Sequence, residues 1–586
     1  MKILSCHAGY HDSAAAVFDE YRLLAAVQQE RLTRKKSDGN GVPFACIDEC
    51  LAITGISRQD IDVVVVTRGA LPWRYYTHFA GGRFVEGKVR QWLGKEKLKS
   101  MALELRRSGG TQAEGIFNGR GFLVDLGFGA DVKLGFCNHH MSHALPALFY
   151  TDWDDALLVT SDGGGDNVQY SHRVFRDGRI ETLYGGDEYL LAPTRIDSLG
   201  LAYGYATQAL GYRINRHEGK LTGLSAYGSP ALFDDLAPHF TLHRNGQIES
   251  DFESYPAMRR FIFELAEGAA PEDVAASIQK LLEEFMLGSV RRLLELHPVR
   301  HLGLAGGVFA NVKLNRLLAE HTAAEEVFIF PAMGDEGLAV GGALQFLLKR
   351  DGLERWLSER HRLDDVYLGR AYDDSIDAVL CECPGVARVA EEPVKESVAL
   401  LASGRIGAIY TGRMEFGPRA LGARSILASP LDRTINATLN ARLGRTEFMP
   451  FAPVVAEEDA EAVFEIGPLN RYAGRFMTMT CAVRAAWRDK IPAVIHVDGT
   501  ARPQIVARHQ NPLYFDILEL FKAATGLPVL INTSFNVHEE PIVNRPEECL
   551  QALVDRRIDF VVTSRGVYAM ADEPLDGRRM EPPEHP

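Results

Sequence analysis

The sequence is poor in cysteine and contains no long hydrophobic run. Eight cysteines in 586 residues are too few for a disulfide-rich scaffold, and the pairs Cys46/Cys50 and Cys381/Cys383 lack the repeated spacing of a zinc knuckle. No stretch of about 18 apolar residues could cross a membrane. The N-terminal residues MKILSCHAGYHD lack the basic and apolar regions of a signal peptide. We therefore expect a cytoplasmic protein with reduced thiols and no membrane partner.

Basic residues are also in the minority. Lys and Arg number 64 against 78 Asp and Glu, which gives a formal net charge of −14 at pH 7. A net-acidic chain is a poor candidate for non-specific binding to nucleic acid, so we expect no nucleic-acid partner. The hydrophobic fraction of 46% and the charged fraction of 24% are typical of globular proteins and argue against extensive disorder.

A strand–turn–strand pattern occurs twice in the first half of the chain. The first set of apolar runs comprises residues 2–6, 14–18 and 23–27, and the second comprises residues 156–160, 168–175 and 179–184. Glycine, acidic and other turn residues separate the runs, as expected for hairpins. The repetition predicts an internal duplication.

A charged stretch at residues 349–364 predicts a domain boundary. We expect an N-terminal domain over residues 1–352 and a C-terminal domain over residues 365–570. Residues 571–586 are charged and rich in proline, which predicts a frayed tail. Within the first domain, apolar residues recur with a period near 3.6 over residues 273–297 and predict a long helix.

The clearest candidate for a metal site begins with the segment HHMSH. His139 and His143 lie four residues apart, so on a helix they share one face and could bind one metal ion. No Glu follows His139 as in the HExxH motif of zinc proteases. Asp162 and Asp335 each lie in a turn after an apolar strand, where side chains can meet over a cleft. Two His and two Asp suit Fe(II), Zn or Mn, although ordinary core or surface histidines remain an alternative.

Three glycine-rich segments form a second candidate site. They are SDGGGD at 161–166, GKLTG at 219–223 and LAGGVFAN at 304–311. Exposed backbone N–H groups in such turns suit phosphate oxygens, and Lys220 adds a cation. None matches the P-loop or GxGxxG pattern, and each alone is compatible with a plain tight turn. With the duplicated hairpins, they resemble the plan of actin-like ATPases, in which a nucleotide lies between two related halves.

Arginine is concentrated among glycine and serine in the second half. Residues 412–425, 440–445 and 500–502 carry this pattern. In an acidic chain it favours an anion site, because guanidinium groups bind phosphate or carboxylate oxygens in pairs. Solvated surface arginines are the alternative. The segment NTSFN at 532–536 follows an apolar strand and offers hydroxyl and amide groups to a small polar ligand, or forms a plain turn.

Together these motifs resemble those of the NodU/CmcH-type O-carbamoyltransferases, which include enzymes that carbamoylate Nod factors, cephems and aminoglycosides such as tobramycin. The resemblance covers about residues 1–570. The nine motifs that carry it, in chain order, are HDS (11–13), HHMSHA (139–144), SDGGGD (161–166), GKLTGLSAYG (219–228), GGVFAN (306–311), GDEG (334–337), GRMEFGPRALGARS (412–425), HVDGTARPQ (496–504) and NTSFNVHEEPIV (532–543). Nine motifs in one order make a chance match improbable.

The resemblance implies an α/β protein with an N-terminal actin-like (ASKHA, TsaD-like) duplicated domain and a C-terminal YrdC-like domain. It implies that the C-terminal domain converts carbamoyl phosphate and ATP to carbamoyl-adenylate. The carbamoyl group would then pass to a small-molecule acceptor hydroxyl at the metal site of the N-terminal domain. Iron is the metal that the resemblance implies, with Zn or Mn as alternatives. A Mg ion beside ATP and a homodimer are left open.

The matching positions assign roles to individual residues. The resemblance implies that His11 and Asp12 are catalytic, with His11 as the base. The implied metal ligands are His139, His143, Asp162 and Asp335. The implied nucleotide-binding residues are Gly163, Gly164, Gly165, Lys220, Gly223, Gly306, Gly307 and Asn311. The implied carbamoyl phosphate-binding residues are Arg419, Arg424, Arg445, Arg502, Asn532, Ser534 and Asn536.

The segment 443–453 departs from a pattern found in part of that family, K-x-R-E-x-F-R-P-F-A-P. Leu443 and Met449 stand at two cationic positions, and their effect on carbamoyl phosphate binding is open. This form is similar to the Nod-factor branch and favours a sugar hydroxyl as the acceptor, with a hydroxyl of another secondary metabolite as the alternative. Residues 70–120 and 185–215 match no motif and are expected to shape the acceptor pocket.

Three other functions fit some of the motifs. A threonylcarbamoyl transferase acting on tRNA would share the metal and nucleotide motifs but not the second half. An actin-like small-molecule kinase would transfer phosphate and would not need HHMSH. A non-catalytic, nucleotide-gated binding module is the third alternative.

Overall fold

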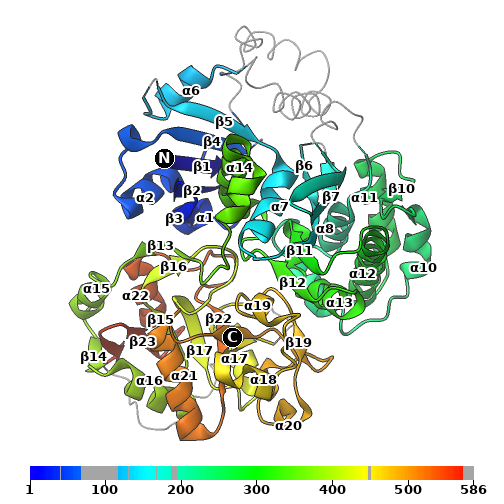
Figure 1. Ribbon diagram of the computed structural model, residues 1–586. Coiled ribbons are helices and arrows are strands. Elements are labelled where there is room, and N and C mark those ends of the chain that lie inside the picture. The colour runs from blue at the N-terminus through cyan, green and yellow to red at the C-terminus, as the bar shows by residue number, and fades with distance from the viewer. Residues whose placement is uncertain are drawn as a thin grey trace, which may run out of the picture. The chain divides into compact units, whose positions relative to one another are not determined.

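The computed structural model describes residues 1–39, 41–67, 71, 75, 117–129, 131–166, 168–186, 195–445 and 450–571. These residues form two compact units (Figure 1). The first unit comprises Met1–Thr33 and Ser37–Leu363, and the second comprises Arg34–Lys36 and the chain from Asp364 onward. The predicted tail lies outside the described residues beyond its first residue, Ala571.

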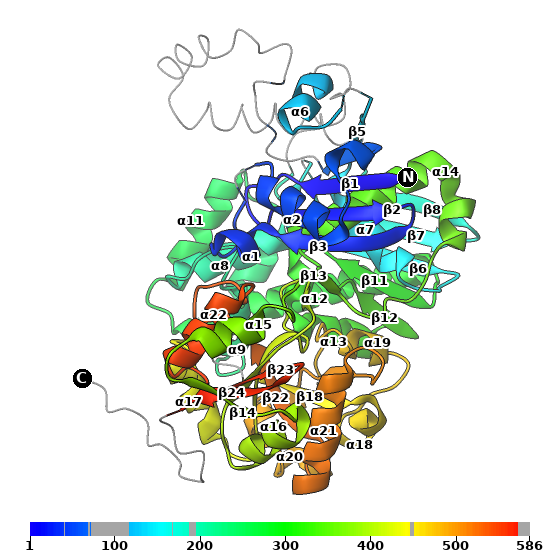
Figure 2. The same cartoon turned by 90° about the vertical axis from the view of Figure 1, so that its left-hand side faces the viewer.

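The first unit contains two five-stranded sheets with the same topology. The first sheet has the order β3-β2-β1-β4-β5, and the second has the order β8-β7-β6-β11-β12. In each, three strands form an antiparallel meander, and two parallel strands follow on the other side of its first strand. Figure 2 shows the meander β1–β2–β3. The repeated order is that of actin-like proteins and confirms the predicted duplication.

The strands of the first sheet are β1 (Lys2–His7), β2 (Ala14–Asp19), β3 (Arg22–Gln28), β4 (Val63–Thr67) and β5 (Lys133–Cys137). The strands of the second are β6 (Ala156–Gly165), β7 (Val168–Arg176), β8 (Arg179–Tyr184), β11 (His301–Ala305) and β12 (Glu326–Ile329), and a small hairpin adds β9 (Phe240–Leu242) and β10 (Ile248–Ser250). Strand β4 is fully buried, which explains its unbroken run of four valines.

Helices cover these sheets. They are α1 (Gln29–Thr33), α2 (Phe44–Thr54), α6 (Gly119–Asp125), α7 (His139–Phe149), α8 (Leu199–Ala209), α9 (Glu218–Leu224), α10 (Phe233–Leu236), α11 (Tyr255–Ala266), α12 (Pro271–Leu296), α13 (Val312–His321) and α14 (Leu338–Ser358). Short 3₁₀ turns occur at Arg58–Asp60, Ala237–His239, Gly307–Ala310 and Asp335–Gly337. Helix α12 confirms the long helix predicted over residues 273–297.

Helix α14 packs on both β1, of the first sheet, and α7, the helix that precedes the second sheet (Figure 1). Gly341 and Gly342 make this close approach possible. A Cβ atom at Gly341 would overlap the Ser142 carbonyl of α7, and one at Gly342 would lie 2.8 Å from Ser5 Oγ of β1. The same packing brings the turn before α14, which contains Asp335, toward the start of α7.

The second unit is built on one eight-stranded mixed sheet of order β14-β24-β23-β15-β17-β22-β18-β21. Its strands are β14 (Val386–Ala390), β15 (Gly407–Tyr410), β17 (Arg424–Ala428), β18 (Ala452–Ala456), β21 (Gln504–Val506), β22 (Val529–Ser534), β23 (Phe560–Thr563) and β24 (Gly566–Met570). Two small ladders pair β13 (Tyr367–Ala371) with β16 (Arg413–Glu415), and β19 (Cys481–Ala482) with β20 (Thr500–Ala501). The predicted α/β class is confirmed, and the more particular likeness to YrdC stays a prediction.

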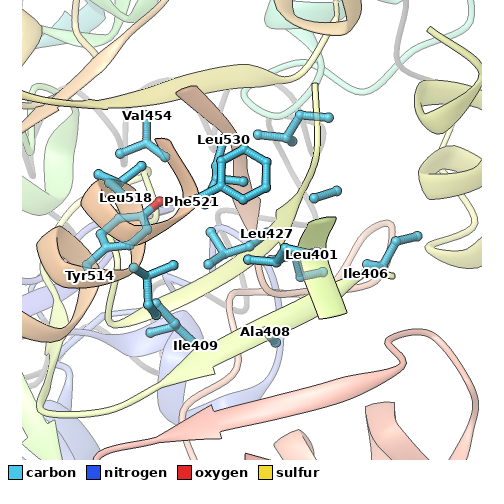
Figure 3. Packing of buried hydrophobic residues seen from close by; sticks show 14 of the residues in the cluster. Leu401, Ile406, Ala408, Ile409, Leu427, Val454, Tyr514, Leu518, Phe521 and Leu530 are labelled. Carbon is cyan, nitrogen blue, oxygen red and sulfur yellow. The ribbon is translucent and has the colours of Figure 1, made fainter. Parts of the chain in front are cut away.

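The helices of the second unit are α15 (Ile376–Glu382), α16 (Pro393–Ala402), α17 (Thr434–Arg442), α18 (Ala460–Val463), α19 (Arg471–Gly474), α20 (Ala485–Arg488), α21 (Pro512–Thr525) and α22 (Pro546–Val554), with 3₁₀ turns at Glu457–Asp459 and Pro492–Val494. Helix α21 places Tyr514, Leu518 and Phe521 in the core, at helical spacing (Figure 3). They pack near Leu427 and Leu530 of the sheet. Burying each such side chain contributes about 1.5–3 kcal/mol and anchors the strand ends from which the arginine-bearing loops emerge.

All eight cysteines are free, as predicted. Hydrophobic packing, not disulfide cross-linking, therefore stabilises both units. Among the residues that the structure describes, no helix combines the length and the apolar composition needed to span a lipid bilayer.

Candidate functional site

Two of the three histidines of the HHMSH segment, His139 and His143, face one another near the start of α7. Asn138 caps this helix, its side chain accepting a hydrogen bond of 2.8 Å from the Met141 backbone N–H. Asp166 accepts another of 2.8 Å from the His139 backbone N–H. The Nε2 atoms of His139 and His143 lie 3.2 Å apart, and both side chains are almost fully buried. The predicted i, i+4 spacing therefore places two imidazole nitrogens at one point.

Two carboxylates reach the same point from two other elements. Asp162 lies near the end of β6, and Asp335 begins the 3₁₀ turn before α14. Asp162 Oδ2 is 3.1 Å from His143 Nε2 and 3.6 Å from His139 Nε2. Asp335 Oδ1 is 3.4 Å and 3.6 Å from the same two atoms. The four predicted ligands thus offer two nitrogens and two oxygens within 4.8 Å of one another.

This geometry fits a divalent cation. Metal–ligand distances near 2.1 Å place neighbouring donor atoms about 3.0–3.4 Å apart, close to the spacings in this cluster. Asp335 Oδ1 is buried without a hydrogen-bond partner, as expected for an atom whose partner is an ion. The middle histidine, His140, is excluded because Thr160 Oγ1 and the Val168 carbonyl lie 2.8 Å from its two ring nitrogens. The donor set suits Fe(II), Zn or Mn.

The electrostatics of the cluster favour charged carboxylates. Burial and the neighbouring Asp335 would raise the pKa of Asp162, but hydrogen bonds from His139 and His143 hold it below its usual value. Burial likewise opposes ionisation of Asp335, and the nearby His139 and His143 lower its pKa. For His143, burial would lower the pKa, whereas the neighbouring carboxylates of Asp162 and Asp335 raise it to about 9. The buried carboxylates therefore require positive partners, either protons on the imidazoles or a metal ion.

The predicted base, His11, lies beside this cluster. Its Nε2 is 3.8 Å from Asp335 Oδ2, its Nδ1 is 3.0 Å from Asp12 Oδ2, and its side chain is 33% exposed. Asp12 adopts a left-handed backbone conformation with φ of 51°. Burial would lower the pKa of His11, but the hydrogen bond to Asp12 and the charge of Asp335 raise it to about 10. His11 is therefore the solvent-accessible side chain of the cluster, and it lies between the carboxylates of Asp12 and Asp335.

Sequence reasoning missed a fourth imidazole at this site. His7 ends strand β1, its Nε2 is 3.5 Å from Asp335 Oδ2, and its Nδ1 is 2.7 Å from Thr67 Oγ1. Burial lowers its pKa. The available signal was a histidine at the end of an otherwise apolar strand, four residues before His11.

The glycines predicted to bind nucleotide gather around Asp162. The Gly163 backbone N–H donates to Asp162 Oδ1 over 2.6 Å, and a Cβ atom at Gly307 would lie 3.1 Å from the same oxygen. Gly306 has φ of 99°, and a Cβ there would overlap the Ser161 carbonyl. A Cβ atom at Gly165 would overlap the His139 ring. The glycines therefore give this site room for close backbone approach, and Gly164 continues the same turn with φ of 143°.

The other predicted nucleotide residues lie on two helices. Lys220 and Gly223 are buried in α9, with the Lys220 ammonium 5.7 Å from the centre of the Tyr212 ring. Asn311 caps α13, and its amide donates to Gln279 Oε1 over 2.8 Å and to Thr222 Oγ1 over 3.4 Å. Asn311 and α9 are thus neighbours, joined by a buried polar network.

In the second unit, three predicted anion-binding residues form one cluster. Arg445 donates to Ser534 Oγ over 3.1 Å, to Asn536 Oδ1 over 2.6 Å and to Thr533 Oγ1 over 2.9 Å. Asn532 lies deeper, fully buried, and donates to the Ala420 carbonyl over 3.0 Å. The NTSFN segment is therefore hydrogen-bonded to the loop of residues 416–424, which contains Ala420 and Arg419.

The arginine-bearing loop, residues 416–424, is held from within. Arg424 is fully buried, donates to the Thr411 and Ala423 carbonyls and lies 3.9 Å from the centre of the Tyr410 ring. Glu415, which sequence reasoning missed, accepts hydrogen bonds of 2.7–3.0 Å from three backbone N–H groups of the loop through one oxygen. Arg419 in this loop and Arg502 after β20 are half-buried.

Of the two positions that depart from the family pattern, the structure describes Leu443 but not Met449. Leu443 is buried and lines a cavity of about 270 Å³ together with Phe535 and Asn536. Its neighbour Arg442 is paired with Asp559 over 2.6 Å. Met449 lies outside the described residues, as do most of residues 70–120 and residues 187–194, which were expected to shape the acceptor pocket.

Fold and site together define a two-unit α/β protein whose actin-like unit carries a candidate metal centre. Residues 2–344 match the family model described as Carbamoyltransferase N-terminus, and residues 398–569 match Carbamoyltransferase C-terminus. The chain belongs to the carbamoyltransferase family and is a transferase. This confirms the family resemblance noted in the sequence.

Known relatives match over most of the chain. Nodulation protein NolNO of Sinorhizobium fredii is 32% identical and covers 97% of this chain and 81% of its own length. Nodulation protein U of Rhizobium tropici is 33% identical over 90% of each chain. Among solved structures, HypF of T. kodakarensis is 16% identical, with a TM-score of 0.30 over 60% of this chain and 48% of its own. At that TM-score the likeness carries no argument, and the fold assignment depends on the strand order.

Proposed function

We propose that this carbamoyltransferase is ATP-dependent and works in two steps, one in each unit. In the predicted C-terminal domain, residues 365–570, carbamoyl phosphate and ATP yield carbamoyl-adenylate. In the predicted N-terminal domain, residues 1–352, the carbamoyl group passes to an acceptor hydroxyl, on a sugar or a secondary metabolite. Family membership and the separate placement of the His/Asp and arginine clusters support this proposal.

For the first step, the residues proposed to bind carbamoyl phosphate are Arg419, Arg424, Arg445, Arg502, Asn532, Ser534 and Asn536. Arg445, Ser534 and Asn536 already contact one another at one strand end, which brings guanidinium, hydroxyl and amide groups together there. Such donors bind the oxygens of a phosphate strongly. Asn532 and Arg424, which bond to backbone carbonyls, would act by fixing the loop that presents Arg419.

For the second step, His139, His143, Asp162 and Asp335 would hold a divalent metal, with Fe(II) as the first choice. Such an ion, when bound, supplies a Lewis acid that polarises a carbonyl or phosphoryl oxygen. The residues proposed to bind the adenylate part of the substrate are Gly163, Gly164, Gly165, Lys220, Gly223, Gly306, Gly307 and Asn311. Backbone N–H groups in the glycine turns and the Lys220 ammonium suit phosphate oxygens.

His11 would remove the proton of the acceptor hydroxyl as the carbamoyl group is attacked. Asp12 would orient the ring through Nδ1, which leaves Nε2 for the acceptor. The carboxylates of Asp12 and Asp335 keep His11 protonated at neutral pH when their charges are uncompensated. Neutralisation of Asp335 by a bound cation would lower the pKa of His11 toward the range of a useful base.

The observation that carries this proposal is the position of Asp335, whose two oxygens face the His139/His143 pair and His11 respectively. Metal ligation and acceptor activation would therefore meet at one carboxylate. The test is product analysis of the purified protein with carbamoyl phosphate, ATP and a panel of glycoside acceptors. We expect carbamoylated acceptor together with AMP, pyrophosphate and phosphate. Formation of ADP and a phosphorylated acceptor would instead identify a kinase, and modification only of tRNA would identify a threonylcarbamoyl transferase-like enzyme.

A further inference from the structure

The two oxygens of Asp335 have different neighbours. Oδ1 faces the Nε2 atoms of His143 and His139 at 3.4 and 3.6 Å and has no hydrogen-bond partner. Oδ2 faces His7 Nε2 at 3.5 Å and His11 Nε2 at 3.8 Å. If Oδ1 binds a metal ion, the orientation of the carboxylate depends on what holds Oδ2.

His7 is the better placed of the two imidazoles to hold Oδ2. It is 2% exposed at the end of β1, whereas His11 lies in a turn with a third of its side chain exposed. Strands β1 and β4 are parallel, and their register pairs His7 with Thr67. Thr67 Oγ1 lies 2.7 Å from His7 Nδ1, so the ring is fixed on the side away from Asp335.

The same contact couples the tautomer of His7 to the direction of the Thr67 hydroxyl. When the Thr67 hydroxyl donates to Nδ1, the ring proton of neutral His7 resides on Nε2, the atom that faces Asp335. His7 Nε2 is buried and has no hydrogen-bond partner at its present distance. Gly9 makes room for this nitrogen, because a Cβ atom at Gly9 would overlap it. Thr67, His7 and Asp335 therefore form a series of polar contacts that ends at the candidate metal centre.

We propose that His7 is a positioning residue for the metal centre, holding Oδ2 of Asp335 so that Oδ1 stays turned toward His139 and His143. The inference rests on the proposed metal site and goes beyond its four ligands. By occupying Oδ2, His7 also leaves His11 available to the acceptor hydroxyl. Partners that orient a ligating side chain commonly change metal affinity by about 10–100-fold when removed.

The test measures metal affinity directly, by competition between the full-length protein and a chromogenic chelator for Zn²⁺. His7→Phe should bind Zn²⁺ about 10–100-fold more weakly than the wild type. His7→Gln should retain most of the affinity, because its amide N–H can replace Nε2–H. Thr67→Val, which removes the hydroxyl that contacts Nδ1, should fall between them. His172→Phe is the matched control, since His172 is a buried strand histidine of the same unit that lies in β7, and it should leave the affinity unchanged.

Two further results separate the possible explanations. Circular dichroism and thermal unfolding of the metal-free variants show whether each is folded, and only folded variants are compared. The visible spectrum of the Co²⁺-saturated His7→Phe protein should show the same coordination number as the wild type, because His7 is not a ligand; a spectrum that shows the loss of a donor would overturn the positioning role. Unchanged Zn²⁺ affinity in folded His7→Phe would also overturn it. Failure of the wild type to bind any divalent metal would overturn the proposed metal site itself.

Discussion

Asp335 Oδ2 lies 3.8 Å from His11 Nε2, while Oδ1 of the same carboxylate lies 3.4 Å from His143 Nε2. One side chain at the start of a 3₁₀ turn thus joins the candidate base to the candidate metal ligands. The close packing of α14 on α7 and β1 fixes that turn, since Gly341 allows contact with the α7 backbone and Gly342 allows contact with side chains of the first sheet. We therefore assign metal binding and acceptor activation to the connected His/Asp group of the first unit. We assign carbamoyl phosphate binding to the arginine group of the second unit.

Removing a metal ligand should separate these functions. His139→Ala or His143→Ala should lose most bound metal, because each deletes one of the four donor atoms. The C-terminal unit should still form AMP and pyrophosphate from ATP and carbamoyl phosphate. Elemental analysis of the purified proteins checks the first point. His243→Ala, a 41% exposed histidine of the same unit, is the control; full metal occupancy in both site variants would refute the assignment.

Arg419 of the arginine-bearing loop and Arg502 after β20 should control the use of carbamoyl phosphate. Arg419→Ala and Arg502→Ala should each raise the KM for carbamoyl phosphate by about 10–150-fold, equivalent to 1.5–3 kcal/mol for one charge-assisted hydrogen bond. Steady-state release of AMP measures this effect. Arg508→Ala, which removes a 59% exposed arginine of the same unit, should have no effect. KM values equal to the wild type in both variants would remove these residues from the pocket.

Glu415 should matter for stability and for the same step. Its Oε1 accepts three backbone hydrogen bonds from the loop that carries Arg419, and its side chain is 1% exposed. Glu415→Gln keeps the shape but loses the charge, so we expect a loss of about 1–3 kcal/mol in the free energy of unfolding. Urea denaturation of the variant beside Glu391→Gln, a change at an exposed glutamate, measures it. Equal midpoints for all three proteins would show that the loop does not depend on this carboxylate.

Much of this architecture could be predicted from sequence, because the signals were local. The duplicated hairpins and the amphipathic pattern of α12 each lie within a few tens of residues. The spacing of His139 and His143 likewise implied a shared helix face. The sequence could not reveal the contact of His7 with Asp335 or that of Thr67 with His7, because these pairs are separated by 328 and 60 residues and depend on strand register.

Arginine illustrates a second limit. The sequence pattern assigned Arg424 and Arg445 the same role, since both stand among small residues. In the structure, Arg424 is fully buried and donates to backbone carbonyls, whereas Arg445 is part-buried and donates to both side chains and backbone carbonyls at the end of β22. Residue type and spacing indicate that a guanidinium group needs acceptors, and only the fold shows whether those acceptors belong to the protein or to a ligand.

The stability of the first unit should depend on the protonation of Asp197. Burial raises the pKa of this side chain to about 6, from an ordinary value of 3.8, and Tyr184 and Arg195 oppose the shift only in part. A raised folded-state pKa stabilises the fold fully below pH 3.8, and that stabilisation is lost as the pH rises through 6. Asp197→Asn should therefore gain stability relative to the wild type between pH 4.5 and 7.5, by up to about 3 kcal/mol. Thermal or urea unfolding across this range measures the difference, and a difference independent of pH would contradict the assignment.

The central claim is that the two half-reactions occur at separate sites, and the most direct test is the ratio of carbamoylated acceptor to AMP in His11→Asn. The change removes the proposed base but leaves every residue of the second unit in place. The account predicts continued formation of AMP and pyrophosphate, or accumulation of carbamoyl-adenylate, with carbamoyl transfer reduced by about 10²–10⁴-fold. Equal loss of both products would contradict it, and so would transfer at the wild-type rate.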